Sequence, residues 1–143
     1  MASEGPFKQS GIMRAVRRAH TKPEMLVRKA MHALGLRFRL HAKLLPGSPD
    51  IVLAKHHTLV FVHGCFWHRH PGCKYATTPK TRQEFWNPKF EGNVARDARK
   101  EAQLQELGWR VLIVWECETK DLVALDVRLR REFGLPPAAP RTP

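Results

Sequence analysis

The run WRVLIVWE, residues 109–116, constrains the fold of this chain more than any other segment. It is nearly continuously apolar and has the length of a strand. A strand whose successive side chains are all apolar has to be covered on both faces of its sheet. We therefore expect a central strand buried on both faces, in a sheet with helices packed against both sides.

The segment that follows residue 20 has the pattern of a capped helix. Thr21 can act as the N-cap, Pro23 suits the first turn, and Glu24 closes a capping box. Gly35 is placed to end the helix. The spacing predicts an apolar stripe that consists of Leu26, Val27, Ala30, Met31 and Leu34.

Strand and helix patterns alternate through the rest of the chain. Residues 36–40 alternate apolar and polar side chains, as a half-buried strand does. Two short apolar runs, 51–54 and 59–62, are predicted to form a strand pair in the core. Helices are expected over two further segments, roughly Lys89–Leu107 and Lys120–Phe133. These patterns predict a small mixed α/β domain with a central sheet between helices.

Length and charge narrow the class of protein. At 143 residues the chain forms one domain, expected over residues 21–135, between a basic arm (1–20) and a Pro-rich, disordered tail (136–143). Lys and Arg number 25 against 13 Asp and Glu, a net charge of +12. This surplus favours nucleic acid as a partner, because each cation placed on a phosphate releases condensed counterions. The alternative is a soluble protein that happens to be basic.

The same sequence indicates where the protein acts. No apolar run approaches the ~20 residues that cross a bilayer, so we expect no membrane partner. The first 20 residues lack the apolar stretch of a secretory signal. The expected location is the cytoplasm, where cysteines stay reduced and bind metal more often than they form disulfides.

Two of the three cysteines lie in one loop, and the third lies far from it in the sequence. Cys65, His70 and Cys73 have the spacing C-x4-H-x2-C, and Cys117 lies just past the apolar run of residues 109–116. Thiolates and an imidazole around a tetrahedral centre favour Zn²⁺, and four protein ligands leave no open position for water. Such a zinc would be structural. The alternative is that the cysteines are small buried hydrophobes and His70 an ordinary loop histidine.

Three acids are candidates for binding a second, catalytic ion. Nucleases hold a hard divalent cation with carboxylates at the end of a sheet, where main-chain carbonyls also point inward. Asp50 begins one predicted strand and Val62 ends its neighbour, so a carboxylate and a carbonyl can converge there. Glu24 and Asp97 lie on the flanking helices. Each acid also has an ordinary explanation: Glu24 as a capping residue, Asp97 on a solvated helix face, Asp50 in a turn.

The loop also carries two further histidines and a pair of large aromatic residues. His63 and His68 titrate near neutrality and could supply a general base, although any single histidine is more often structural. Phe66 and Trp67, and Trp86 after Phe85, would ordinarily form a local core. On a basic protein they could instead wedge between base pairs.

Five segments, in order, resemble one known family. They are MRAVRRAHTKPE, LPGSPDIV, FVHGCFWHRH, EFWNPKFEGNVARDARK and LQELGWRVLIVWEC, and they run from about Ser10 to Cys117. They strongly resemble the very short patch repair (Vsr) DNA mismatch endonucleases, a divergent branch of the restriction-endonuclease-like nucleases. Those nucleases usually carry Pro-Asp and then an acid-x-Lys on the next strand. LVFVHG has no such acid or lysine, which indicates that imidazole replaces lysine-centred chemistry.

The resemblance implies an Mg²⁺-dependent nick in one strand, on the 5′ side of the thymine in a T:G mismatch left by deamination of 5-methylcytosine. By position, it implies Asp50 as the direct Mg²⁺ ligand, together with the carbonyl of Val62. It implies His68 as the general base for the attacking water. Three other residues would organise water around the ion, and they are His63, Glu24 and Asp97.

The resemblance also assigns the remaining candidates. It implies a structural Zn²⁺ held by Cys65, His70, Cys73 and Cys117. An intercalating wedge would consist of Phe66, Trp67 and Trp86. The N-terminal arm would reach the opposite groove of the DNA through Met13, Arg14, Arg17 and Arg18.

The expected partner is double-stranded DNA with a T:G mismatch, bound by a monomer that associates with the bacterial nucleoid when it acts. Downstream mismatch-repair proteins are further candidate partners. Two other functions stay open from the residues alone. One is a restriction-like nuclease for undistorted DNA or another lesion, and the other is a non-catalytic, zinc-stabilised DNA-binding module.

Overall fold

A computed structural model describes residues 21–42 and 45–138 of the chain. The expected arm, with Met13, Arg14, Arg17 and Arg18, lies outside the described residues, and so do residues 139–143 of the expected tail. Within the described part, no helix has both the length and the apolar character needed to span a membrane.

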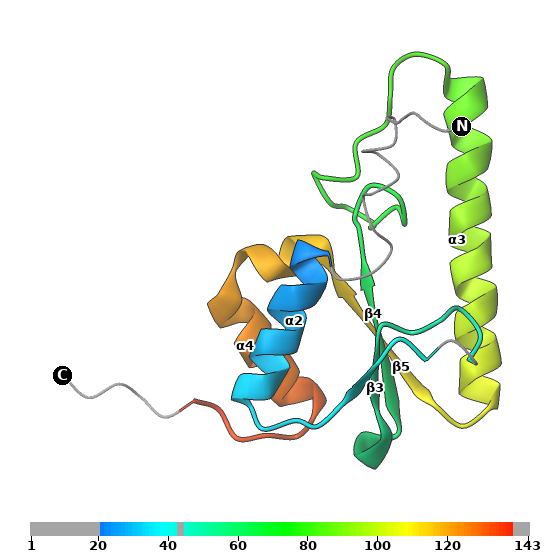
Figure 1. Ribbon diagram of the computed structural model, residues 1–143. Coiled ribbons are helices and arrows are strands. Elements are labelled where there is room, and N and C mark those ends of the chain that lie inside the picture. The colour runs from blue at the N-terminus through cyan, green and yellow to red at the C-terminus, as the bar shows by residue number, and fades with distance from the viewer. Residues whose placement is uncertain (1–20, 43–44, 139–143) are drawn as a thin grey trace, which may run out of the picture.

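A mixed four-stranded sheet forms the centre of the domain (Figure 1). Its strands follow the order β2-β3-β4-β5, with antiparallel pairing except between β4 and β5, which run parallel. The predicted pair of short core strands is confirmed as the antiparallel hairpin β3–β4. The strands are β2 (Arg39–Leu40), β3 (Ile51–Leu53), β4 (Thr58–His63) and β5 (Arg110–Trp115).

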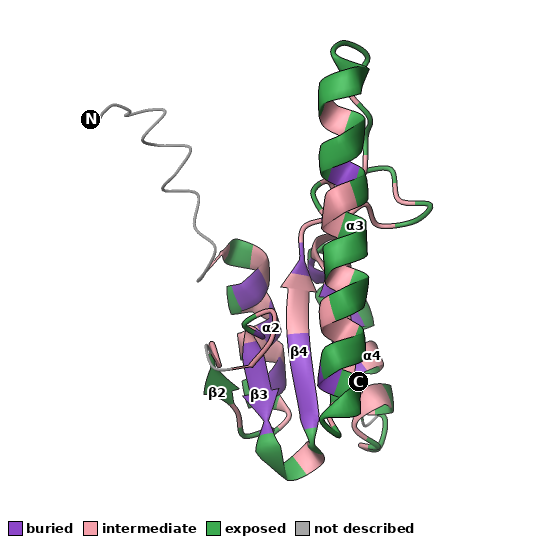
Figure 2. Cartoon of the chain, turned by 90° about the vertical axis from the view of Figure 1, so that its right-hand side faces the viewer, coloured by how far each residue is buried: buried purple, intermediate pink, exposed green. Residues whose placement is uncertain are grey.

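Helices cover both faces of this sheet, as expected. Figure 1 shows α2 and α4 side by side on one face and α3 on the other. Figure 2 shows β3 and most of β4 buried between them, and the outer face of α3 exposed. The α-helices of the described residues are α2 (Lys22–Ala33), α3 (Gln83–Glu106) and α4 (Leu122–Glu132), and the short 3-10 helices are η1 (Ala54–His56) and η2 (Glu116–Lys120).

Each face of the sheet has its own apolar core. On the α3 face, Leu104 packs with Val52 and Leu59. The larger core, on the other face, combines residues of α2 and α4 with the strands, and its members include Val27, Met31, Leu125, Leu129, Ile51, Leu53, Val60, Leu112 and Val114. Burial of these side chains is the main free-energy source for the layered arrangement.

The start of α2 follows the capping pattern only in part. Thr21 Oγ1 accepts a hydrogen bond from the backbone N–H of Glu24 at 3.3 Å, as an N-cap should. The Glu24 side chain, 2 % exposed, turns to Arg28 and His41. Position 24 is therefore occupied by a buried acid that faces other polar groups, and the explanation of Glu24 as a capping acid alone does not fit.

The apolar run of residues 109–116 forms β5, but it is not the central strand. In the sheet of the described residues, β5 pairs with β4 alone, and β4 lies between two neighbours. Leu112 and Val114 are buried under α2 and α4, whereas Val111 and Ile113 on the other face are half-buried. The reason is a cleft between the sheet and α3, which Val111 and Ile113 line.

Helix α3 begins six residues before the predicted start. It runs from Gln83 and contains Pro88, although a proline normally removes a helical hydrogen bond and breaks the helix. The turns before the proline are held by aromatic packing. Trp86 stacks on Phe90 with ring centroids 5.8 Å apart and meets Phe66 of the loop after β4 at 6.2 Å. Tertiary contacts here outweigh the local cost of the proline.

Two other predicted boundaries shift for local reasons. The strand expected over residues 36–40 pairs with β3 only at Arg39 and Leu40, and Leu40 is exposed at the sheet edge. The last helix begins at Leu122, because the Asp121 carboxylate accepts from the N–H of Ala124 at 3.1 Å and caps it there.

Candidate active site and metal centre

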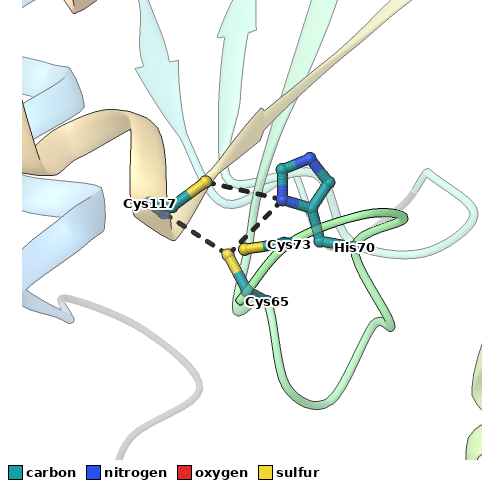
Figure 3. Close-up of side chains that lie close together, drawn as sticks. All are labelled: Cys65, His70, Cys73 and Cys117. Carbon is teal, nitrogen blue, oxygen red and sulfur yellow. Dashed lines mark hydrogen bonds between the residues drawn. The ribbon is translucent and has the colours of Figure 1, made fainter. Parts of the chain in front are cut away.

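The ends of β4 and β5 bring the expected zinc ligands together. The two strands are parallel with His63 opposite Trp115, so the residues two positions further on, Cys65 and Cys117, emerge side by side. His70 and Cys73 return from the loop after β4 to the same place (Figure 3). One ligand atom of each of the four residues lies within 4.8 Å of the others.

The contacts within this cluster point every donor inward. His70 Nδ1 lies 3.7 Å from Cys65 Sγ and 3.4 Å from Cys117 Sγ. The backbone N–H of Cys117 donates to Cys65 Sγ at 3.4 Å, and the His70 ring stacks on Trp115 at 4.2 Å. Three sulfurs and one imidazole nitrogen are a tetrahedral donor set for a borderline-soft dication. The cluster can hold a metal ion.

Burial alone does not account for these cysteines. Cys65 is fully buried, as a small hydrophobe would be, but Cys73 and Cys117 are only half-buried and still turn their sulfurs into the cluster. Burial raises the pKa of the Cys117 thiol to about 12. A dication in the cluster would reverse this shift, because the thiolate is the form that binds metal.

A second polar centre lies in the cleft between the sheet and α3. The cleft has a volume of about 510 Å³. It contains the expected residues Asp50, His63, His68 and Asp97, and two cations of α3 that the sequence did not single out, Arg96 and Lys100. Its lining is completed by Gly47, Ser48, Phe61, Val62, Glu101, Val111 and Ile113.

Asp50 is fixed at the start of β3 by the neighbouring strand. Its backbone N–H donates to the carbonyl of Val60 at 3.1 Å, and its carboxylate accepts from the N–H of Val62 at 2.7 Å. The N–H and C=O of one strand residue point to the same side of the strand. The carbonyl of Val62 is therefore directed to the same side as the Asp50 carboxylate, although the observed contact uses the N–H.

The surroundings of Asp50 disfavour its charge when no ion is bound. Burial raises the pKa of its carboxyl group from 3.8 to about 6, against the lowering effect of the Val62 hydrogen bond. The folded state thus holds the proton more tightly than the unfolded state. Ionisation costs stability as the pH rises from about 4 to 6, and the full cost is present above pH 6.

We expect Asp50→Asn to melt above the wild type at pH 8 and at the same temperature near pH 4. The side chain of Asn accepts the Val62 hydrogen bond without carrying the charge, so the melting temperature at pH 8 should rise by roughly 5 °C relative to the wild type. Calorimetry without added divalent ions measures it. Addition of Mg²⁺ should raise the melting temperature of the wild type only, and equal melting of the two proteins at both pH values would contradict the assignment.

His68 is oriented by Asp97 and stacked on His63. His68 Nδ1 lies 2.6 Å from Asp97 Oδ2, and the two imidazole rings are nearly parallel with centroids 3.8 Å apart. Burial, and then the nearby His68, lower the pKa of His63 to about 4, so His63 is neutral at physiological pH. The Nδ1 contact of His68 leaves Nε2 for water in the cleft. Asp50 and His68 face this same cleft.

Glu24 lies near Asp50, together with His41, which the sequence patterns did not predict. Glu24 Oε2 lies 2.8 Å from His41 Nε2 and forms an ion pair with Arg28. Ligand atoms of Glu24, His41 and Asp50 lie within 4.8 Å of one another. His41 has a φ of 51° and donates its backbone N–H to the carbonyl of Asp50. Its position depends on this turn, which residue patterns do not reveal.

The candidate wedge residues form one aromatic cluster between the loop and α3. Phe66 contacts Trp67 at 4.9 Å and Trp86 at 6.2 Å, and Phe90 below them is buried. Trp67 is 50 % exposed, so the cluster combines a packed base with a projecting ring. Asn93 of α3 donates to the carbonyl of Trp67 at 3.0 Å and ties the loop to the helix.

These features define a class of protein by its fold: a restriction-endonuclease-like domain, in which an acid at a strand end faces a cleft. The fold agrees with that of the homing endonuclease I-Bth0305I catalytic domain, with a TM-score of 0.53 and 21% sequence identity over 78% of this chain and 92% of that one. Ligand atoms at this strand end could hold a metal ion.

Sequence comparison identifies the family. The family model described as DNA mismatch endonuclease Vsr matches residues 4–74. The type II nicking enzyme V.XorIIP of Xanthomonas oryzae pv. oryzae is 53% identical, over 87% of this chain and 91% of the relative. The DNA mismatch endonuclease Vsr of Escherichia coli K12 is 48% identical, over 76% and 69%. The chain belongs to the Vsr family of DNA mismatch endonucleases. It is a DNA endonuclease, and DNA is its substrate.

Proposed function

We propose that this endonuclease nicks one strand of a T:G mismatch, on the 5′ side of the thymine, with Mg²⁺ as its catalytic ion. The observation that carries the proposal is the cleft in which the Asp50 carboxylate faces the same space as the His68–Asp97 pair. A carboxylate beside an oriented imidazole is what metal-assisted hydrolysis of a phosphodiester requires. The lesion follows from deamination of 5-methylcytosine, as the family resemblance implies.

The donor atoms around Asp50 fit a hard divalent cation. Asp50 would bind Mg²⁺ together with the carbonyl of Val62, and both donors are oxygens, which this ion prefers. When bound, Mg²⁺ offsets the negative charge that develops on the phosphoryl group. His68, held through Nδ1 by Asp97, takes the proton from the attacking water at Nε2. His63 and Glu24 orient water in the cleft.

The zinc cluster has a structural role in this proposal. Zn²⁺ would be held by Cys65, His70, Cys73 and Cys117, whose four donors leave no coordination site for substrate. The loop between Cys65 and Cys73 carries both His68 and the aromatic residues. A zinc ion at its base would therefore fix the general base and the wedge in one unit, and would couple recognition to catalysis.

Recognition of the mismatch is assigned to the aromatic cluster. Phe66, Trp67 and Trp86 would insert beside the T:G pair, where unstacking costs less than at a Watson–Crick pair. The arm of residues 1–20 would reach the opposite groove through Met13, Arg14, Arg17 and Arg18. We further propose that the protein acts at the nucleoid as a monomer, with one domain over residues 21–135. Mismatch-repair proteins would then process the nicked DNA.

A panel of duplexes tests this function. Purified protein with Mg²⁺ is incubated with end-labelled duplexes that are matched or contain T:G, U:G or a hypoxanthine base. We expect a nick in the thymine strand of the T:G duplex alone. Cleavage of the matched duplex, or of another lesion in preference to T:G, would favour the restriction-like alternative. Tight, salt-sensitive binding with no cleavage under any divalent ion would favour a DNA-binding module.

Variants of His68 and Asp97 should show that the two residues act as a unit. We expect His68→Ala to lower the single-turnover nicking rate by about 10³-fold and Asp97→Asn by about 10²-fold, because general-base catalysis requires the oriented ring. The double variant should be no slower than His68→Ala. If the two losses multiply, Asp97 does not act through His68.

Trp67→Ala should remove mismatch selectivity and leave the fold intact. Loss of one stacking contact should reduce affinity for the T:G duplex by about 10–100-fold and bring it close to the affinity for a matched duplex. Fluorescence anisotropy on both duplexes measures the ratio. Tyr75→Ala removes an exposed ring from the same loop and serves as the control, with the ratio unchanged. A retained preference in Trp67→Ala would remove the wedge assignment.

A further inference from the structure

Lys100 lines the cleft and has no role in the function proposed above. It follows Asp97 by three residues on α3, so the two side chains share one helix face, about 4.5 Å apart along the axis. Both line the cleft that contains Asp50 and His68. Lys100 thus lies one helical turn along the cleft from the residue that orients the proposed general base.

The stem of Lys100 is held by its surroundings. Gly47 lies in the turn before β3 with a φ of +78°, and a Cβ added there would lie 3.1 Å from Lys100 Cδ and 3.4 Å from Lys100 Cβ. The same added atom would lie 3.3 Å from Phe61 Cε1. The glycine therefore leaves room for the aliphatic part of Lys100 between the turn and the ring. This packing keeps the side chain in the cleft and reduces the entropy it loses on binding a ligand.

The ammonium group of Lys100 is not neutralised by the acids nearby. Within residues 21–42 and 45–138, no carboxylate forms an ion pair with it. The neighbouring cation, Arg96, is engaged differently: its Nη1 donates to Asn93 Oδ1 at 3.0 Å, toward the aromatic cluster. Lys100 thus lines the cleft without an ion pair to a carboxylate of the described residues, and its ammonium group is available to a ligand there.

We propose that Lys100 binds the phosphate next to the scissile one on the nicked strand. The proposal rests on the function proposed above, because it takes the cleft to be the place of the cut. Ammonium groups bind phosphate as compact point charges with three donors. The offset of one helical turn from Asp97 places Lys100 beyond the reacting group, toward the next phosphate. Its charge offsets the repulsion that Asp50, Asp97 and Glu101 would exert on the DNA backbone.

A double-mutant cycle between protein and DNA tests this contact. Lys100→Met removes the charge and keeps the stem, and a single methylphosphonate removes the charge of one phosphate on either side of the nick position. Affinities for T:G duplexes are measured with Ca²⁺, so that no cleavage is needed. We expect Lys100→Met alone and the methylphosphonate alone each to weaken binding by about tenfold. At one of the two phosphate positions, the two changes together should weaken binding by no more than either change alone.

Three controls separate the contact from a structural or general charge effect. Lys100→Arg should restore binding, and melting temperatures of all variants should match the wild type. Arg99→Met removes an exposed cation of the same helix outside the cleft, and its effect should be independent of the methylphosphonate. Multiplicative losses for Lys100→Met at both positions would overturn the proposal. Failure of the wild type to nick would remove the proposed function, and the binding cycle would then show only whether Lys100 contacts a backbone phosphate at these positions.

Discussion

Replacing Asp50 by Asn is expected to abolish nicking and to leave DNA binding largely intact. The carboxylate is the proposed direct ligand of Mg²⁺, and its loss removes the group that would hold the ion in the cleft. A loss of about 4 kcal/mol in transition-state stabilisation corresponds to a rate reduced by roughly 10³-fold. Single-turnover nicking of a T:G duplex at saturating protein measures the chemical step, and anisotropy measures binding.

The control for this result is Asp126→Asn on α4, on the opposite face of the sheet from the cleft. It removes the same charge and an ion pair with Arg130, so it reproduces the change in net charge without touching the cleft. Its nicking rate should equal that of the wild type. Full activity in Asp50→Asn would show that the metal assignment is wrong, even if the family and the fold stand.

The second large effect is expected at the zinc cluster. Cys117→Ser should lower the zinc content from one ion per chain to near zero and strongly destabilise the fold. Structural zinc contributes about 10 kcal/mol or more of apparent binding free energy, which is comparable to the whole stability of a small domain. Elemental analysis gives the zinc content, and calorimetry gives the stability. Nicking should be lost as well, because the loop carries His68 and Trp67.

His32→Ala is the matched control for the zinc experiment. His32 is an exposed histidine on α2, away from the cluster, so zinc content and melting temperature should stay at the wild-type values. A folded wild-type protein that contains no zinc, together with a Cys117→Ser variant of unchanged stability, would instead support the interpretation of the cysteines as small buried hydrophobes.

Most of the site could be predicted from residue spacing and from which residues lie at the ends of the predicted strands. The approach of Cys65 to Cys117 follows from the parallel pairing of the two strands that precede them, and the approach of Asp50 to Val62 follows from the β3–β4 hairpin. Such contacts can be predicted, because residues at the ends of neighbouring strands meet whatever the rest of the fold does. The capped start of α2 was also predictable, because it depends on a few residues that are adjacent in the sequence.

Features set by tertiary packing were predicted poorly. The position of β5 at the sheet edge depends on the order of strands, which an apolar run does not encode. The sequence predicted a helix only from Lys89, but aromatic contacts between the loop and α3 sustain the helix from Gln83 onward. His41 and Lys100 reach their places through a turn and a helix face that have no signature in their own neighbourhoods. Polar residues of this kind look like solvated surface until the fold is known.

The half-buried carboxylate of Asp50 and the stacked histidines indicate a site whose polar groups are placed for a ligand rather than for stability. Burial raises the pKa of Asp50 and lowers that of His63, so the ion-free fold disfavours charge on both residues. Groups that destabilise the free protein and gain a partner in the complex are typical of catalytic sites. In this account the partners are the ion for Asp50 and the water network for His63.

The most direct test is the location of the two ions in crystals of the protein with a T:G duplex, Mn²⁺ in place of Mg²⁺, and data at both absorption edges. We predict an anomalous peak for manganese at coordination distance from the Asp50 carboxylate, and a peak for zinc among Cys65, His70, Cys73 and Cys117. A manganese peak bound instead between His63, His68 and Asp97, with none at Asp50, would contradict the account.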